Sequence, residues 1–174
     1  DANVDLFLTS AGVSVGDYDM VKDVLSSEGE MQFWQVRMKP GKPLAFGALR
    51  VRSQVLKSVP LLGLPGNPVS AMISFETFAR PAILTMLGKT KFDRPTVRAM
   101  LLEDAKNDSN RRNFIRVIVQ KTTSGLTART TGEQGSGILT SVSKANGLLM
   151  IPENVEAVRK GDVVDVQMVD WGEW

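Results

Sequence analysis

The sequence feature that most limits how this chain can fold is an apolar run that ends in a Pro-Gly-Asn-Pro turn. Val59–Leu64 is typical of a buried strand. The run stops at Pro65 and Gly66, where a glycine lets the backbone turn sharply. Asn67 is a good N-cap residue, and Pro68 suits the first position of a helix, where its missing N–H costs nothing. This order predicts a strand, a tight turn and a helix.

The predicted helix is expected to end at Gly88, which is placed as a C-terminal cap, and to bend at Pro81. Free N–H groups and the dipole at the start of a helix favour an anion. We therefore look for function around the turn at residues 65–68. The helix itself is indicated by apolar residues at helical spacing, namely Val69, Met72, Ile73, Phe75, Phe78, Ala82, Ile83 and Met86.

A similar strand, loop and helix is predicted at the start of the chain. Asp5–Thr9 favours a short strand, and the small residues of Ser10–Asp17 favour a loop. A short helix should begin at Asp19. Two such units indicate an α/β domain with a parallel sheet, in which ligands bind at the carboxyl ends of the strands.

Between these units, Gln32–Met38 alternates like a strand and is interrupted by the turn Lys39–Pro43. Its two prolines and its glycine predict a rigid turn that holds the ammonium groups of Lys39 and Lys42 in place. Leu44–Gly47 resumes an extended run. Arg50–Lys57 is polar and is predicted to be a hairpin tip or a surface loop.

The composition changes after Gly88, and the charged segment Lys89–Pro95 is predicted to be a linker. We place the domain boundary near residue 94, with domains at residues 1–94 and 95–174. One helical turn is expected at Ile138–Val142. The second half is predicted to be a small all-β barrel or sandwich, with strands at Thr96–Leu102, Asn113–Gln120, Leu126–Thr131, Gly147–Pro152 and Val163–Met168.

The composition excludes several kinds of chemistry. The 174 residues include no cysteine and no histidine, so disulfides, thiolate nucleophiles and imidazole bases are excluded. Any chemistry must use carboxylates, lysines, hydroxyls and backbone groups, with or without a hard metal such as Mg²⁺. A net charge of +2 does not argue for nucleic acid, and no run approaches the roughly 20 apolar residues of a membrane span. The first residue is not methionine, so we expect a piece of a longer protein.

Two groups in the first half are candidates for binding a ligand. The loop at Gly12–Gly16 has backbone N–H groups that suit phosphate, although it lacks the Walker lysine and the full dinucleotide spacing. The alternative is a simple strand-to-helix turn. Asp19, with Asp17 beside it, is the candidate metal carboxylate, and the alternative is an N-cap.

Further candidates are basic or lie in loops of small residues. Lys39 and Lys42 could hold an oxyanion in their rigid turn, although lysines are common in surface turns. In the second half, the loop Gly132–Gly137 is able to approach a ligand closely. Arg116, which lies near Arg111 and Arg112 in the sequence, could pair with phosphate or belong to a solvated face.

Three motifs in order resemble one known family. They are Thr9–Asp19 (TSAGVSVGDYD), Met38–Pro43 (MKPGKP) and Gly63–Ser70 (GLPGNPVS), and Thr131–Ser136 and Ala145–Gly147 continue the match. In these residues the chain is similar to molybdopterin molybdenumtransferase, the bacterial relative of the gephyrin E domain. The resemblance covers nearly the whole chain. It implies part of the family's α/β domain, with a mostly parallel sheet and flanking helices, followed by a small C-terminal β-barrel.

The resemblance also implies an enzymatic activity in molybdenum cofactor biosynthesis. The reaction is the Mg²⁺-dependent insertion of molybdate into adenylated molybdopterin, after which the adenylate is hydrolysed and molybdenum cofactor is released. Asp19 matches the family's active-site acid, which helps to bind the metal or molybdate. Lys39 should stabilise oxyanions, and Ser136 matches a barrel serine that faces the pocket. The residues expected to bind substrate are Gly12, Ser14, Gly16, Lys42, Pro65, Gly66, Asn67, Pro68 and Arg116.

The chain departs from the family pattern at two positions and in its extent. Ala11 replaces the first of two usual glycines, and Gln35 stands where some members carry a lysine. The family also has upstream domains and the first half of the α/β domain, so this chain alone is expected to be inactive. The resemblance implies a cytoplasmic homodimer that receives its substrate from molybdopterin adenylyltransferase.

Two other functions remain open. The region could be a non-catalytic binding or scaffold module, as in gephyrin-like proteins, where it carries a dimer interface and binds partner peptides. A sugar- or nucleotide-binding domain would need specificity residues that we do not find. The presence of intact upstream motifs in the parent protein would favour the enzyme.

Overall fold

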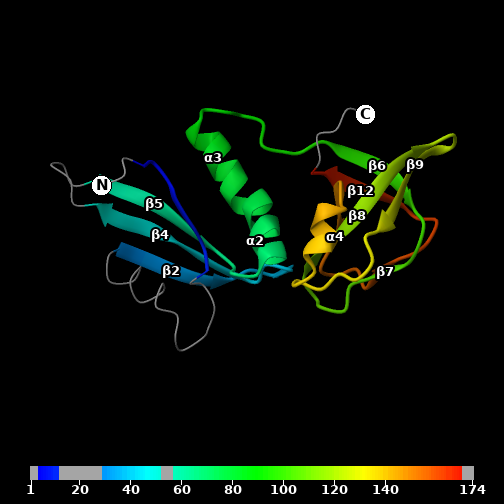
Figure 1. Ribbon diagram of the computed structural model, residues 1–174, viewed down its shortest axis with the longest axis horizontal. Coiled ribbons are helices and arrows are strands. Elements are labelled where there is room, and N and C mark those ends of the chain that lie inside the picture. Colours follow the sequence, from blue (N-terminus) through cyan, green and yellow to red (C-terminus); the bar gives the residue numbers. More distant parts are fainter. Residues whose placement is uncertain (1–3, 12–28, 52–56, 170–174) are drawn as a thin grey trace. The chain divides into compact units, whose positions relative to one another are not determined.

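The computed structural model describes residues 4–11, 29–51 and 57–169. Its contacts divide the chain into two units, which Figure 1 shows with their elements labelled. The first unit comprises Asp1–Val36 and Gly41–Phe92, and the second comprises Arg37–Pro40 and Asp93–Trp174. The division after Phe92 lies two residues before the boundary drawn from the sequence. Residues 37–40, which we had placed in the first domain, group with the second unit.

The first unit contains a four-stranded sheet in the order β1-β5-β4-β2. Its strands are β1 (Phe7–Ser10), β2 (Gly29–Gln35), β4 (Pro43–Val51) and β5 (Lys57–Leu64). Strands β1 and β5 are parallel, whereas β4 is antiparallel to both β5 and β2. The α/β class is confirmed, but the described sheet is not mostly parallel. The reason is length, because a parallel neighbour needs a crossover of about a dozen residues and the links before and after β4 are shorter.

The helix predicted after the Pro-Gly-Asn-Pro turn is present and contains a π-helical turn. It comprises α2 (Pro68–Ser74), the π-helix η1 (Phe75–Ala79) and α3 (Arg80–Met86). The Arg80 N–H donates to the carbonyl of Phe75, five residues back. Pro81 follows at once and has no N–H for the regular ladder, so the wider turn accommodates it.

The ends of this helix match the sequence signals. Asn67 is the N-cap, and its carbonyl accepts a 2.8 Å hydrogen bond from the Ala71 N–H. At the other end, Gly88 has a φ of +70°, and the Lys89 N–H donates to the carbonyl of Leu84 at 2.9 Å. This is a Schellman ending, which favours glycine at the left-handed position. The buried side chains include Val69 and Ile73 on α2.

The second unit contains a closed five-stranded barrel. Its strands pair in the order β10-β12-β6-β9-β8, and β10 also pairs with β8, which closes the ring. All the neighbours are antiparallel except β6 and β9. The predicted barrel is therefore confirmed. The strands are β6 (Thr96–Leu101), β8 (Arg112–Thr122), β9 (Gly125–Thr130), β10 (Gly147–Ile151) and β12 (Val163–Met168).

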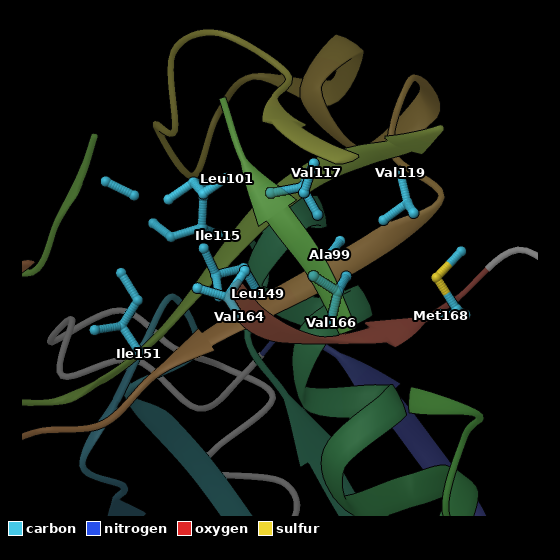
Figure 2. Close-up of a cluster of buried hydrophobic side chains, with 12 residues drawn as sticks. Ala99, Leu101, Ile115, Val117, Val119, Leu149, Ile151, Val164, Val166 and Met168 are labelled. Atoms are coloured by element: carbon cyan, nitrogen blue, oxygen red, sulfur yellow. The ribbon is translucent and has the colours of Figure 1, made fainter. Parts of the chain in front are cut away.

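The barrel interior is filled by aliphatic side chains (Figure 2). Alternate residues of each strand point inward, as the two-residue period of a strand requires. Leu101, Ile151 and Val166 are fully buried. Space is so limited that a Cβ on Gly147 would lie 2.5 Å from a methyl carbon of Val166. The barrel is thus a packed core and not a pore.

Shorter elements complete the second unit. The helix α4 (Leu139–Ser143) confirms the predicted helical turn, whereas the short pair β7 (Ala105–Lys106) and β11 (Ala157–Val158) was not predicted. The strand β3 (Met38–Lys39) pairs in parallel with β8 at Arg112 and Asn113. No described helix has the length and apolarity needed to cross a membrane.

One predicted strand was wrong in its extent. The sequence predicts a single strand at Gln32–Met38, but β2 ends at Gln35 and Met38 belongs to β3 in the other unit. The Val36 N–H donates to the Lys42 carbonyl at 2.7 Å, which continues the β2–β4 pairing by one bond. Residues 37–41, between these two residues, form a loop that leaves this pairing. Met38 is buried. Alternation of apolar and polar residues indicates that a side chain is buried. It does not indicate which sheet the residue joins.

Candidate functional site

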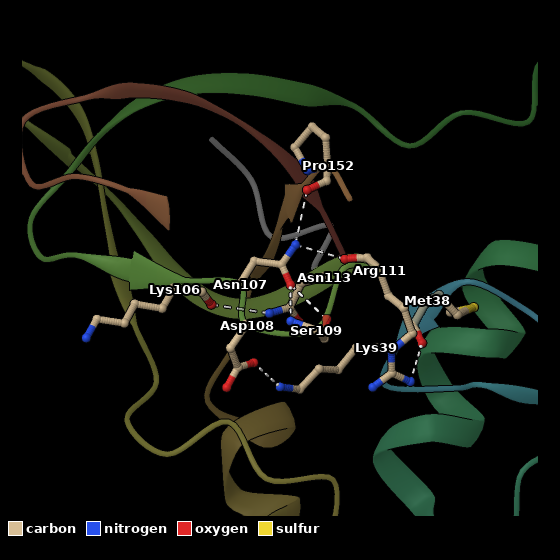
Figure 3. A network of polar contacts seen from close by, with 9 residues as sticks. All are labelled: Met38, Lys39, Lys106, Asn107, Asp108, Ser109, Arg111, Asn113 and Pro152. Atoms are coloured by element: carbon tan, nitrogen blue, oxygen red, sulfur yellow. Dashed lines mark hydrogen bonds and ion pairs between the residues drawn. The ribbon is translucent and has the colours of Figure 1, made fainter. Parts of the chain in front are cut away.

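Lys39 is held by the second unit through both its backbone and its side chain. Its strand β3 pairs with β8, and the Lys39 Nζ lies 2.9 Å from the Asp108 Oδ1. The Arg111 Nη1 donates to the carbonyl of Met38 at 3.2 Å. Figure 3 shows these contacts around the end of β3. The ammonium group of Lys39 is therefore paired with a carboxylate of its own unit.

The turn that carries Asp108 is built around the buried amide of Asn107. The Asn107 Nδ2 donates to the carbonyls of Arg111 at 2.8 Å and Pro152 at 3.1 Å (Figure 3). Its Oδ1 accepts from the hydroxyl of Ser109 at 2.8 Å. Because a buried amide is costly when it is unpaired, these bonds specify one conformation of the turn.

The Lys39–Asp108 pair is exposed to solvent, so it positions a charge more than it stabilises the fold. The hydrogen bond and the charge of Lys39 hold the pKa of Asp108 below its ordinary value of 3.8. A carboxylate whose pKa is lowered in the folded protein stays ionised, and paired with its cation, at any pH above that pKa. The ion pair is lost as the pH falls through the folded pKa. The pair is therefore intact at neutral pH.

Substituting Lys39 by methionine should move the pKa of Asp108 up toward 3.8. The measurement is a pH titration of the Asp108 carboxyl carbon by NMR in the wild type and in Lys39→Met. Asp104 is the matched control, because its pKa is lowered by the backbone N–H of Lys160 and by Arg159 and should not move. An unchanged Asp108 midpoint in Lys39→Met would mean that the ion pair does not form in solution.

In the first unit, the turn at residues 65–68 lies beside the start of the small-residue loop. The last rung of the β1–β5 ladder joins Ser10 to Leu64, and a Cβ on Gly66 would lie 3.6 Å from the Ala11 Cα. The carboxyl ends of these two parallel strands are thus side by side, as expected. Pro65 is buried, whereas Gly66 and Pro68 are exposed.

The rest of the small-residue loop lies outside the described residues. This applies to Gly12, Ser14 and Gly16, and also to Asp19 at the predicted start of the next helix. Lys42 is exposed in the first unit, so the two lysines of the rigid turn belong to different units. The arrangement of all these residues in one site stays a prediction.

In the second unit, Ser136 lies exposed in the loop between β9 and α4, as a contact with a ligand would require. Arg116 lies beneath this loop on β8 with only 1% of its surface exposed. Its guanidinium donates to the Ser141 hydroxyl and the Gly135 carbonyl, both at 3.1 Å. Burial lowers the pKa of Arg116. In this arrangement its donors contact the loop, whereas we had expected them to contact substrate.

Two family models match the chain in order. Residues 1–85 match a probable molybdopterin binding domain, and residues 98–169 match the MoeA C-terminal region, domain IV. The second match contains all five strands of the closed barrel except the first two residues of β6.

The chain combines a molybdopterin-binding type of domain with a MoeA C-terminal domain.

Molybdopterin molybdenumtransferases, a gephyrin and a MoeA crystal structure align with nearly the whole chain. It is 32% identical to molybdopterin molybdenumtransferase of Haemophilus influenzae over 168 residues, which are 95% of this chain and 40% of that protein. It is 31% identical to gephyrin of Dictyostelium discoideum, of which it covers 25%. The crystal structure of a molybdopterin biosynthesis MoeA protein from Pyrococcus horikosii superposes with a TM-score of 0.73 at 29% identity, covering 98% of this chain and 38% of that one. The chain thus spans about 40% of the length of its curated bacterial relatives.

Magnesium, which the MoeA resemblance implies, finds no complete ligand set in the part of the chain that the structure describes. No group of three acidic side chains gathers there. Asp19, the residue assigned to the metal, lies outside that part. The described residues therefore do not fit a magnesium site by themselves, and we derive no step through the metal.

Sequence reasoning missed the residues that contact Lys39 and the loop of Ser136. Asn107 and Asp108 lie between two predicted strands and were given no role, and Gln134 was included in a matching loop without a role of its own. The available signals were an Asn in a polar turn and a Gln beside a glycine, since side-chain amides often bond to backbone groups in turns and loops.

Proposed function

We propose that the complete protein that contains this chain inserts molybdate into adenylated molybdopterin, releasing molybdenum cofactor and the hydrolysed adenylate. The observation that carries the proposal is the order of the two family matches, a molybdopterin-binding domain followed by MoeA domain IV, over almost the whole chain. Several relatives are named molybdopterin molybdenumtransferase, which supports the same reaction class.

The residues suit anionic substrates. Molybdate and the phosphates of an adenylated pterin are anions, and the chain offers a positioned ammonium at Lys39 and a turn at residues 65–68 that opens a helix. Backbone N–H groups at such a turn and a fixed ammonium both stabilise oxyanions. Ser136 is proposed to contact the substrate from the barrel, and Asp19 to help hold Mg²⁺ or molybdate.

The remaining parts of the proposal concern the whole protein. We propose that it acts as a homodimer in the cytoplasm and receives its substrate from molybdopterin adenylyltransferase. Because this chain spans about 40% of its curated bacterial relatives, the 174 residues alone are expected to show no turnover.

The experiment is a turnover assay on the complete gene product that contains this chain. Purified protein is given adenylated molybdopterin, and the released adenylate and the cofactor are measured with and without molybdate and Mg²⁺. We expect turnover that requires both. Asp19→Ala should lower the rate at least about tenfold, since one electrostatic contact to a reacting group is commonly worth that much or more. Asp165→Ala, an exposed change on β12, is the control.

A second candidate is a non-catalytic binding module, which the match to a gephyrin favours. The same assay distinguishes the two. If the complete protein binds adenylated molybdopterin but shows no molybdate-dependent turnover, the binding module is the better description. If Asp19→Ala turns over at the normal rate, the role given to Asp19 is wrong.

A further inference from the structure

Within the described part of the chain, a buried arginine on β8 has no acidic partner. Arg116 is 1% exposed, and no carboxylate of the described residues forms an ion pair with it. A buried cation is costly unless it is hydrogen-bonded, and its bonds here go to oxygens of its own unit. Besides the Ser141 hydroxyl and the Gly135 carbonyl, the Nη1 lies 3.5 Å from the Phe114 carbonyl. Arg116 therefore ties β8 to the loop and to α4.

The backbone of Arg116 is tied to the same loop by a glutamine. The Arg116 N–H donates to the Gln134 Oε1 at 2.8 Å, and the Gln134 Nε2 donates to the Arg116 carbonyl at 3.2 Å. The Thr131 N–H also donates to that carbonyl, at 3.1 Å. Since β9 ends at Thr130, the Gln134 amide takes the place of a strand peptide just beyond the last rung of the ladder.

This arrangement acts on a loop whose own sequence gives it little rigidity. Gly132, Gly135 and Gly137 surround Ser136, and Gly132 has a φ of +95°. Glycine-rich backbone has many conformations to lose on ordering. The loop contacts Arg116 from two sides: Gln134 bonds its peptide, and the Gly135 carbonyl bonds its guanidinium. Ser136 is the next residue in the chain.

We propose that Gln134 and Arg116 are positioning residues, which hold the loop 132–137 so that Ser136 meets the anionic substrate in one geometry. The expected effect on kinetics rests on the proposed function. The expected effect on the conformation of the loop does not. Neither residue needs to touch the substrate. Ser141, which is also 1% exposed, completes the arrangement by accepting from the Arg116 Nε.

The same strand offers a matched control. The Val119 N–H donates to the Asn146 Oδ1 at 2.7 Å, and the Asn146 Nδ2 donates to the Val119 carbonyl at 2.9 Å. This amide bridges one peptide of β8 just as Gln134 does, but it stands before β10 and not in the loop of Ser136. Asn146→Ala therefore removes the same kind of bonds from the same strand.

The first test does not depend on enzymatic activity. In Gln134→Ala, amide hydrogen exchange of Arg116 should accelerate at least about tenfold, because its N–H loses the Gln134 Oε1 acceptor. Exchange in the loop 132–137 should accelerate as well, because the loop loses the side chain that ties it to β8. In Asn146→Ala the acceleration should appear at Val119, with the loop unchanged. Equal protection of the loop in the wild type and in Gln134→Ala would overturn the proposal.

The second test uses a double-mutant cycle in the complete gene product. Gln134→Ala should lower kcat about tenfold with KM changed less than about threefold, since it alters the placement of Ser136 and not the binding surface. In a Ser136→Ala background the same substitution should change kcat less than twofold, whereas Asn146→Ala should act equally in both backgrounds.

The outcomes separate this inference from the proposed function. Equal effects of Gln134→Ala with and without Ser136 would show a general structural role and overturn the positioning of Ser136. An absence of molybdate-dependent turnover in the wild type would refute the proposed function instead, and the hydrogen-exchange test would still decide the loop's conformation.

Discussion

Replacing Lys39 by methionine should lower kcat/KM for molybdate insertion by about two to three orders of magnitude, which is the usual loss for one group that stabilises an oxyanion. Methionine is an unbranched side chain one atom shorter than lysine, and it lacks the charge and the hydrogen-bond donors. The β3–β8 pairing uses backbone groups, so the fold should persist. The measurement is steady-state turnover of the complete gene product that contains this chain, across a range of molybdate concentrations.

Two variants make this result specific. Lys121→Met removes an exposed lysine from β8 in the same unit and should leave kcat/KM within about twofold, as expected for a surface change. Asp108→Asn removes the carboxylate that holds Lys39 while keeping the ammonium. Asp108→Asn should lower kcat/KM less than Lys39→Met does, because a positioning partner contributes less than the charge itself. Wild-type turnover in Lys39→Met would remove Lys39 from the site.

Truncating Leu149 to alanine should destabilise the protein by about 3 kcal/mol, within the range of roughly 2–5 kcal/mol for a buried leucine. Leu149 is 2% exposed and lies on β10, which pairs with both β8 and β12 and so closes the barrel. A cavity there is bounded by β-strands on all sides, so the neighbours have little freedom to collapse into it. The measurement is urea unfolding of the wild type and the variant.

The control for this prediction is a leucine of the same unit that faces solvent. Leu139, at the start of α4, is 55% exposed, and Leu139→Ala should change the free energy of unfolding by less than about 0.5 kcal/mol. An equal decrease in the free energy of unfolding in Leu149→Ala and Leu139→Ala would mean that the barrel interior is not the packed core that the structure describes.

Elements with strong local signals were predicted well. The strand that ends at Leu64, the N-cap at Asn67 and the glycine ending at Gly88 all follow from the residues themselves, because turn and cap chemistry is local. The barrel strands were also found, to within a few residues. The strand predicted at Val163–Met168 has the same bounds in the structure, since its alternation of apolar and polar residues begins directly after the turn Lys160–Asp162.

Pairings between distant segments were not predictable from these signals. Nothing local to Met38 indicates that it pairs with β8, more than 70 residues later in the chain. For the same reason the sequence could suggest that Lys39 is held, but not that Asp108 holds it. Arg116 was predicted as a phosphate ligand because arginine suits phosphate, yet its side chain is buried and bonds to the loop 132–137 and to α4. Burial is set by tertiary packing, which composition and spacing do not specify.

The placement of residues 37–40 has a practical consequence for dissecting the protein. Because the second unit is discontinuous in sequence, no single cut separates the two units intact. A truncated protein that begins after residue 94 would keep the closed ring of β6, β8, β9, β10 and β12 but would leave β3 behind. The outer edge of β8 at Arg112 and Asn113 would then lie bare, a ready template for self-association.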